Sequence, residues 1–288
     1  EISGGLVGSE MCIRDSYGDA DQPLILETDE AFNTFEKINI SDLLVLNVDS
    51  DHLDYFKNIV NYKDAFYKVM KNVTDNLVVN NDDLNIKSMK ELKKSVAYGK
   101  DISADFKVQS PGIFIYKNNK YEIKSDIIGD HFKSNMLGAI ILALLNGIEI
   151  MDSLNAIESF PGVKRRIELI GRSKGVSIYD DYGHHPTEME ATITALKQQT
   201  DNKLYVVFQP HRYTRTKEYF NLFKDSLKLA DYAIVTDIYP AGESSIPGVS
   251  SKNFEEECIK YLKSIRYVPE YLSKKVQNGD IILTLGAG

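Results

Sequence analysis

Two carboxylates and two imidazoles occur within six residues of each other, in the segment Asp-Asp-Tyr-Gly-His-His at 180–185. An apolar run at 176–179 precedes this segment. A helical pattern follows it, opening with Pro186, which suits a first helical turn, and Glu188, which suits the positive end of the helix dipole. Ionisable groups at the end of a buried strand are unfavourable in a core, so we interpret the segment as lining a wet cleft. A helix cap with incidental histidines is the alternative.

A second polar cluster, Gln-Pro-His-Arg-Tyr-Thr-Arg-Thr at 209–216, also follows directly after an apolar run. Arg212 and Arg215 stand three residues apart at the entrance to a predicted helix. Guanidinium groups bind carboxylate or phosphate through two parallel hydrogen bonds, and a helix N-terminus attracts anions. We therefore expect an anion site here, next to the first cluster in sheet order. Solvated surface charge is the alternative.

Acidic residues form a third group, at 27–30 and again at 49–54, where His52 accompanies them. Oxygen ligands at adjacent strand ends suit a hard divalent ion that also touches nucleotide phosphates. Magnesium fits better than zinc, because no thiolates are available nearby. A basic run at 164–166 forms the fourth group and lies beside Phe160, Pro161 and Gly162. These basic side chains either form a solvated face or extend toward a nucleotide held by the other domain.

The elements that must position these groups alternate between strands and helices. In the first half we predict buried strands at 24–26, 43–48 and 77–79, a helix around 62–69, a β-hairpin over 106–124 turning at Asn118-Asn119, a helix over 131–145 ended by Asn146-Gly147, and a helix over 152–159. After residue 160 we predict strands at 176–179, 204–208, 232–236 and 281–285, with helices near 186–197, 217–229 and 251–263.

This alternation predicts an α/β fold with a mostly parallel sheet in the second half, covered by helices on both faces. Ligands of such sheets bind outside the carboxyl ends of the strands, where the polar clusters fall. The expected organisation is a non-native leader over 1–16, similar to translated sequencing-adapter sequence, one domain over 17–160 and a second domain over 161–288.

Composition excludes several classes of protein. The 288 residues include 34 Lys+Arg and 42 Asp+Glu, and the resulting net charge of −8 argues against nucleic acid or an anionic membrane as partner. The longest apolar stretch, 139–145, is far shorter than the ~20 residues that span a bilayer. The two cysteines, Cys12 and Cys258, have no metal or redox spacing, which argues against a disulfide scaffold and fits a reducing cytoplasm.

Several motifs together carry a resemblance to a known family. They are NVDSDHLDYF, GDHFKSNMLGAI, GVKRRIE, DDYGHHPTE, FQPHRYTRT, YPAGESSIPG and the terminal LTLGAG. On these motifs the chain resembles the Mur ligase family, ATP-dependent amino-acid ligases of bacterial cell-wall synthesis, from about Tyr17 to Gly288. The resemblance implies part of a central P-loop-type ATPase domain followed by a Rossmann-like C-terminal ligase domain.

The resemblance further implies a reaction, in which ATP phosphorylates the carboxylate of UDP-N-acetylmuramate and the amine of L-alanine attacks the acyl phosphate. Magnesium would be held by Glu27 and His52. Asn135 would contact adenine, and Arg166 with Asp181 would reach the nucleotide from the second domain. The oligomeric state stays open, with a homodimer as one alternative.

Substrate binding and catalysis are assigned by the same resemblance to the second domain. Tyr182, His184, Arg212 and Arg215 would hold the sugar nucleotide or the developing acyl phosphate. His184, Arg212, Arg215 and Asp181 are the expected catalytic residues.

Two alternatives to this activity remain open. A related ligase attaches a whole tripeptide to the same sugar nucleotide, but it typically reads Asp-Phe-Ala where this chain has Asp181-Tyr182-Gly183. The chain could also be a catalytically dead binding module. The family's glycine-rich P-loop is absent from the sequence, as is the amino-terminal domain. We therefore expect an incomplete copy that is inactive alone.

Overall fold

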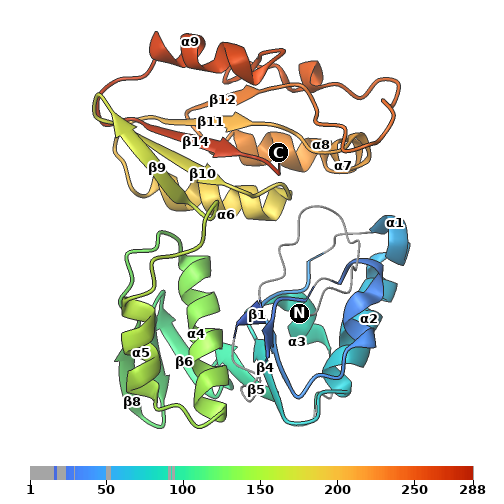
Figure 1. Cartoon of the computed structure of the whole chain (residues 1–288), viewed down its shortest axis with the longest axis vertical. Coiled ribbons are helices and arrows are strands. Elements are labelled where there is room, and N and C mark those ends of the chain that lie inside the picture. Colours follow the sequence, from blue (N-terminus) through green and yellow to red (C-terminus); the bar gives the residue numbers. More distant parts are fainter. Residues whose placement is uncertain are drawn as a thin grey trace. The chain divides into compact units, whose positions relative to one another are not determined.

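The computed structural model describes residues 16–17, 24–28, 30–49, 53–89, 92 and 95–287. The chain forms two compact units (Figure 1). Unit 1 contains the residues up to Ser125 together with Lys133–Ser159, and unit 2 contains Asp126–Phe132 and the residues from Phe160 onward. The chain therefore crosses between the units on both sides of the short segment Asp126–Phe132 as well as after Ser159.

Unit 1 is built on a six-stranded sheet. Its strands run in the order β3 (Asp42–Val45), β4 (Asn76–Asn80), β5 (Ser95–Gly99), β6 (Phe106–Ser110), β7 (Ile113–Tyr116) and β8 (Asn119–Glu122), and the last two are antiparallel to their neighbours. The predicted strand at 77–79 is confirmed as β4, and the one at 43–48 is confirmed in its first part as β3, which ends at Val45. The predicted hairpin is a three-stranded meander, and its tight turn uses Lys117 and Asn118, both at positive φ, one residue earlier than expected.

Helices cover the unit 1 sheet. They are η1 (Ala31–Lys37), α1 (Leu53–Phe56), α2 (Ile59–Lys71), α3 (Leu84–Ser88), α4 (Asp130–Leu145) and α5 (Ile150–Glu158). The side chain of Asn58 caps α2, which buries Tyr62 and Val69 in one core with β3 and β4. The predicted end of α4 is confirmed, because Gly147 follows the helix at φ +85°.

A two-stranded antiparallel ribbon, β1 (Ser16–Tyr17) with β2 (Ile25–Leu26), also belongs to unit 1. We predicted a buried strand at 24–26, and the burial was wrong, because Leu24 and Ile25 are exposed. The reason is that a ribbon of two strands has no second layer of its own to cover its apolar side chains.

Unit 2 is also built on a six-stranded sheet, in the order β13 (Ile259–Tyr261), β12 (Tyr232–Val235), β11 (Leu204–Phe208), β14 (Ile281–Leu285), β10 (Val176–Asp181) and β9 (Glu168–Ser173). All neighbouring pairs are parallel except β10 with β9. The mostly parallel sheet and its four predicted strands are confirmed.

Helices lie on both faces of the unit 2 sheet (Figure 1). On one face α6 (Pro186–Lys197) and α8 (Phe220–Leu227) pack Met189, Ile193 and Phe223 against the strands. On the other face α9 (Val268–Ser273) packs Val268 and Leu272. No helix in the part of the chain that the structure describes is long and apolar enough to cross a membrane.

Two of the predicted helices in unit 2 need correction. The one near 217–229 is divided at Tyr219 into α7 (Tyr213–Glu218) and α8. The one over 251–263 was wrong: a 3-10 turn, η2 (Ser251–Phe254), leads into the edge strand β13. There the fully buried Ile259 pairs with Ala233 of β12, so pairing with the sheet overrides the local helical preference.

Strand order decides which polar clusters meet. Strand β14 lies between β10 and β11, so the expectation that the first two clusters are direct neighbours in the sheet was wrong. Gly286, which directly follows β14, contacts both neighbouring strand ends: its N–H donates to the Asp181 carbonyl oxygen (3.3 Å), and an added Cβ would lie 3.0 Å from the Gln209 carbonyl oxygen. The loops after β10 and β11 therefore approach each other across a glycine.

Candidate active site

The connection from β10 to α6 places a buried carboxylate at the strand end. Asp181 is only 2% exposed, and its two oxygens accept hydrogen bonds from the backbone N–H groups of Ile167 (2.8 Å) and Gly183 (2.7 Å). Burial raises the pKa of Asp181, and these hydrogen bonds with the nearby Arg166 offset only part of the effect. In this structure Asp181 ties the segment before β9 to the turn before α6.

Two arginines lie over the ring of Tyr182, which follows Asp181. The guanidinium carbon of Arg165 lies 5.0 Å from the ring centroid and that of Arg166 lies 5.8 Å away. Arg165 also donates to the Asp180 carboxylate (2.9 Å) and to the Gly286 carbonyl oxygen (2.7 Å). Arg165 thus joins the ends of β10 and β14, while Arg166 extends toward Glu188, 3.7 Å away.

The two histidines of the first cluster have different surroundings. His185 is the N-cap of α6, where Thr187 N donates to its Nδ1 (3.4 Å), so the helix-cap alternative holds for this residue. His184 instead places its ring centroid 6.2 Å from that of His211, in the loop after β11. Its Nδ1 lies 3.1 Å from the Tyr182 carbonyl oxygen. Because a carbonyl oxygen only accepts, Nδ1 of His184 carries the hydrogen.

Glu188, in the first turn of α6, contacts the backbone of the first cluster. Its Oε2 accepts the backbone N–H groups of His184 (3.0 Å) and His185 (3.2 Å). Burial alone would raise the pKa of Glu188, but the His184 ring, the backbone N–H groups and Arg166 lower it overall. Glu188 is therefore an ionised carboxylate that fixes the paired histidines at the start of α6.

The loop after β11 brings a third imidazole and two guanidinium groups to the same sheet edge. His211 is 5% exposed and stacks on Tyr239, with centroids 5.6 Å apart. Arg215, on the first turns of α7, is 7% exposed. Burial, followed by the charges of Arg215, His184 and Arg212, lowers the pKa of His211 to about 4. The site therefore combines a neutral imidazole with fixed positive charge, which suits an anionic ligand.

Arg212 is held by the loop after β12. Its backbone N–H donates to the Tyr239 carbonyl oxygen (2.8 Å), and its Nε donates to Glu243 Oε1 (2.8 Å). Arg212 has φ +69°, a strained conformation for a residue with a side chain. Neither Glu243 nor His211 was among the predicted site residues, although each follows a strand of the parallel sheet as the predicted residues do.

Unit 2 thus brings together Arg166, Asp181, Tyr182, His184, Arg212 and Arg215. Of the other predicted site residues, Glu27 and Asn135 lie in unit 1, and His52 lies outside the described residues. Glu27 is exposed just after β2, and Asn135 is half-buried on α4. Within the described ranges, no three His, Cys, Asp or Glu side chains cluster closely enough to hold a metal ion.

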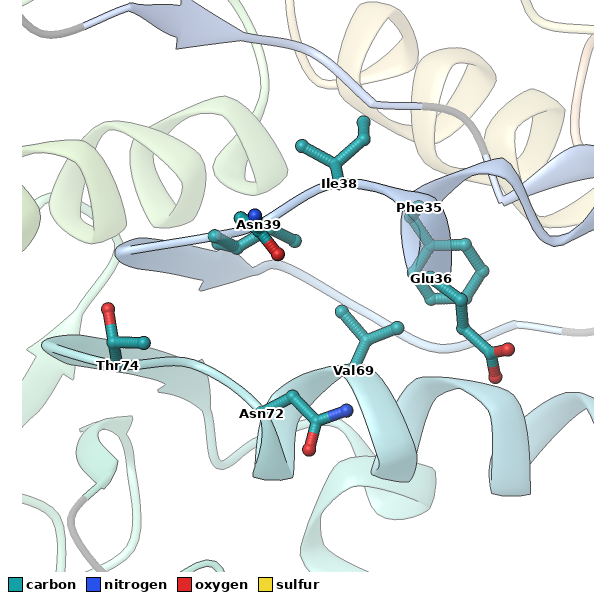
Figure 2. Close-up of a pocket in the computed structure, with 8 residues that line it drawn as sticks. Phe35, Glu36, Ile38, Asn39, Val69, Asn72 and Thr74 are labelled. Carbon is teal, nitrogen blue, oxygen red and sulfur yellow. The ribbon is translucent and has the colours of Figure 1, made fainter.

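Unit 1 also contains a hollow (Figure 2). None of the predicted site residues lines it. Its lining mixes apolar and polar side chains from η1, the segment before β3 and the end of α2: Phe35, Glu36, Ile38, Asn39, Ile40, Val69, Asn72 and Thr74.

Comparison with known families agrees with the fold. Residues 30–143 match the Mur ligase middle domain, and residues 165–288 match the Mur ligase glutamate ligase domain. The chain belongs to the Mur ligase family. Members of this family are ATP-dependent ligases that form amide bonds.

Within the family, the chain is similar to UDP-N-acetylmuramate–L-alanine ligases. It is 38% identical to that of Caldicellulosiruptor saccharolyticus over 98% of this chain and 65% of the relative, and 36% identical to that of Dictyoglomus turgidum over 98% and 66%. The chain therefore spans slightly less than two thirds of the length of these relatives.

Solved structures share the fold. The UDP-N-acetylmuramate–alanine ligase of Thermotoga maritima matches with a TM-score of 0.69 and 23% identity, over 89% of this chain and 58% of that one. A murein peptide ligase from Psychrobacter arcticus matches with a TM-score of 0.59 and 19% identity, over 88% and 56%.

Proposed function

We propose that this chain supplies the middle and C-terminal domains of a cytoplasmic ligase that joins L-alanine to UDP-N-acetylmuramate for peptidoglycan synthesis. One observation carries the proposal: an arginine–imidazole site lies at the carboxyl ends of β10 and β11, in a chain 38% identical to an enzyme of that name. The proposed activity is that of the full length of the relatives, of which this chain spans 65%.

In the proposed reaction, Arg212 and Arg215 bind the anionic part of the sugar nucleotide and neutralise charge as the acyl phosphate forms. Phosphoryl transfer needs positioning and charge neutralisation more than covalent help from the protein, which suits two guanidinium groups held at a sheet edge. Tyr182, whose ring contacts Arg165 and Arg166, would form a wall of the same site.

His184 is our candidate for managing the proton of the incoming amine. Its Nδ1 donates to the Tyr182 carbonyl oxygen at 3.1 Å, so the proton exchanged with the amine would be carried by Nε2. His211 cannot take over this role at neutral pH, because its pKa is lowered to about 4 and the required proton would be held too weakly. The attacking amine must be neutral, so a ring poised to accept its proton favours amide formation.

Nucleotide and metal binding are proposed on the family resemblance. Asn135, Arg166 and Asp181 would contact ATP, with Asp181 acting through the backbone segments that it ties together. Glu27 and His52 would hold magnesium, which would complete its coordination with waters and substrate phosphates and neutralise phosphate charge. A metal titration tests this pair, because His52→Ala should raise the magnesium requirement.

The test measures ADP release that depends on an added amine. It uses a polypeptide that joins this chain to the remaining part of the Caldicellulosiruptor saccharolyticus relative, with its P-loop, and supplies ATP, magnesium and UDP-N-acetylmuramate. We expect release with L-alanine and none with the tripeptide. Release with the tripeptide alone would assign the chain to the murein peptide ligases, and no release with either would favour a binding module.

A further inference from the structure

The loop after β12 contains a carboxylate to which neither the sequence nor the comparisons assign a role. Glu243 accepts hydrogen bonds from Arg212 Nε (2.8 Å), Thr214 N (3.0 Å) and Thr214 Oγ1 (2.6 Å). We propose that Glu243 is a positioning residue that aims the Arg212 guanidinium at an anionic group of the substrate. This inference rests on the proposed function, because it assumes that Arg212 binds the substrate.

Hydrogen bonds fix the backbone of Arg212 independently of its side chain. Its N–H donates to the Tyr239 carbonyl oxygen, and its carbonyl oxygen accepts from Thr216 N (3.1 Å) and Thr216 Oγ1 (2.7 Å). These bonds hold the residue at φ +69° at the start of α7. With the backbone fixed, the long side chain still has several rotamers, and the bond from Nε to Glu243 selects among them.

The bond to Glu243 uses only one part of the guanidinium group. Nε is engaged, and across the described part of the chain Arg212 makes no other ion pair. The two terminal nitrogens therefore remain as a flat edge with parallel N–H groups, which matches the two oxygens of a carboxylate or phosphate. The burial agrees with this orientation: the Glu243 side chain is 16% exposed and the Arg212 side chain is 35% exposed.

An attraction of the site for anions does not explain why the acidic residue Glu243 lies beside Arg212. Burial would raise the pKa of Glu243, but the hydrogen bonds from Thr214 and the charge of Arg212 lower it overall, so the carboxylate is ionised at neutral pH. A negative charge weakens the attraction of the site for anions. The positioning role and a purely electrostatic view therefore predict opposite results when this charge is removed.

Glu243→Gln removes the charge at nearly constant size, and it is tested in the joined polypeptide with L-alanine-dependent ADP release. We expect kcat/KM for UDP-N-acetylmuramate to fall about 10-fold, because a neutral amide oxygen replaces the charged acceptor of the Arg212 Nε–H, with KM for ATP unchanged. The control is Glu255→Gln, which removes the carboxylate paired with Lys260 on the surface of the same unit and should leave kcat/KM unchanged. Unchanged or increased kcat/KM in Glu243→Gln would overturn the proposal.

A double-mutant cycle separates aiming of Arg212 from general support of the loop. If Glu243 acts through Arg212, Glu243→Gln should have little further effect in an Arg212→Ala background. If Glu243 only supports the loop through Thr214, Glu243→Gln should lower kcat/KM by the same factor in the wild-type and the Arg212→Ala backgrounds. That result would show the positioning role to be wrong.

A readout on the 288-residue chain keeps this inference apart from the proposed function. The Arg212 Nε–H should give a slowly exchanging NMR signal that exchanges faster in Glu243→Gln and is unchanged in Glu255→Gln. Failure of the wild-type polypeptide to release ADP would defeat the proposed function alone. Absence of the protected Nε–H signal from the wild-type chain would defeat the positioning role alone.

Discussion

The imidazole of His211 should remain neutral well below pH 6, and replacing it should remove a defined part of the acid sensitivity of unit 2. The ring is buried against Tyr239 and close to Arg212 and Arg215, and its pKa is lowered to about 4. Its Nδ1 has no hydrogen-bond partner among the described atoms. All these features disfavour the charged form of the ring.

The magnitude follows from the two pKa values. A fall from 6.5 to about 4 corresponds to roughly 3 kcal/mol between the protonation states. Because the folded-state pKa of His211 is the lower one, the unfolded chain takes up the proton first on acidification. The stabilisation is therefore fully present above pH 6.5 and is lost as the pH falls toward 4. Between pH 7.5 and 5 the loss should be about 2 kcal/mol.

The test compares the wild type with His211→Phe, which keeps a ring on Tyr239 but cannot be protonated. Urea unfolding of unit 2 between pH 7.5 and 5 should show a loss about 2 kcal/mol smaller in the variant. An NMR titration provides a direct check, because the chain has five histidines and the variant identifies the signal of His211. A wild-type midpoint above pH 6, or equal losses of stability in both proteins, would refute the reasoning.

Three stability predictions concern other parts of unit 2, each measured by urea unfolding at pH 7.5. Leu283→Ala, at a fully buried position of the central strand β14, should lower the free energy of unfolding by about 2–5 kcal/mol. Gly175→Ala should cost about 1–3 kcal/mol, because the glycine has φ +78° and an added Cβ would lie 1.7 Å from Asn278 Oδ1; Gly171→Ala, which has open space, is the control. Arg165→Ala should cost about 1–2 kcal/mol through loss of its ion pair at the end of β10, and no loss would mean that this pair is fully screened by solvent.

The parts of the fold that could be predicted are those where local pattern and tertiary contacts agree. Strands β11 and β14 are apolar runs between polar segments, and α6 begins at the expected proline. The segment 251–263 has helix-forming residues, yet it forms β13, because Ile259 pairs with a strand about 25 residues earlier in the chain. The local periodicity of a segment does not indicate which distant strand it pairs with.

The candidate site could also be predicted only in part. The rule that ligands bind at the carboxyl ends of parallel strands pointed to the segments that contain His184 and Arg212. It could not show that β14 separates their two strands, or that Glu243, 31 residues after Arg212, holds its guanidinium group. Asp181 illustrates a further limit: a carboxylate beside two histidines suggests chemistry, whereas in the structure both of its oxygens accept backbone N–H groups.

The segment Asp126–Phe132 has a consequence for the order in which the chain can fold during synthesis. Ile128 and Phe132 pack against the main core of unit 2, although they leave the ribosome before α5 and before the whole unit 2 sheet. About 150 further residues must be synthesised before that core can form. Until then the apolar side chains of Ile128 and Phe132 remain exposed and accessible to chaperones. For the same reason, a fragment that starts at Phe160 would lack part of the packing around its own core.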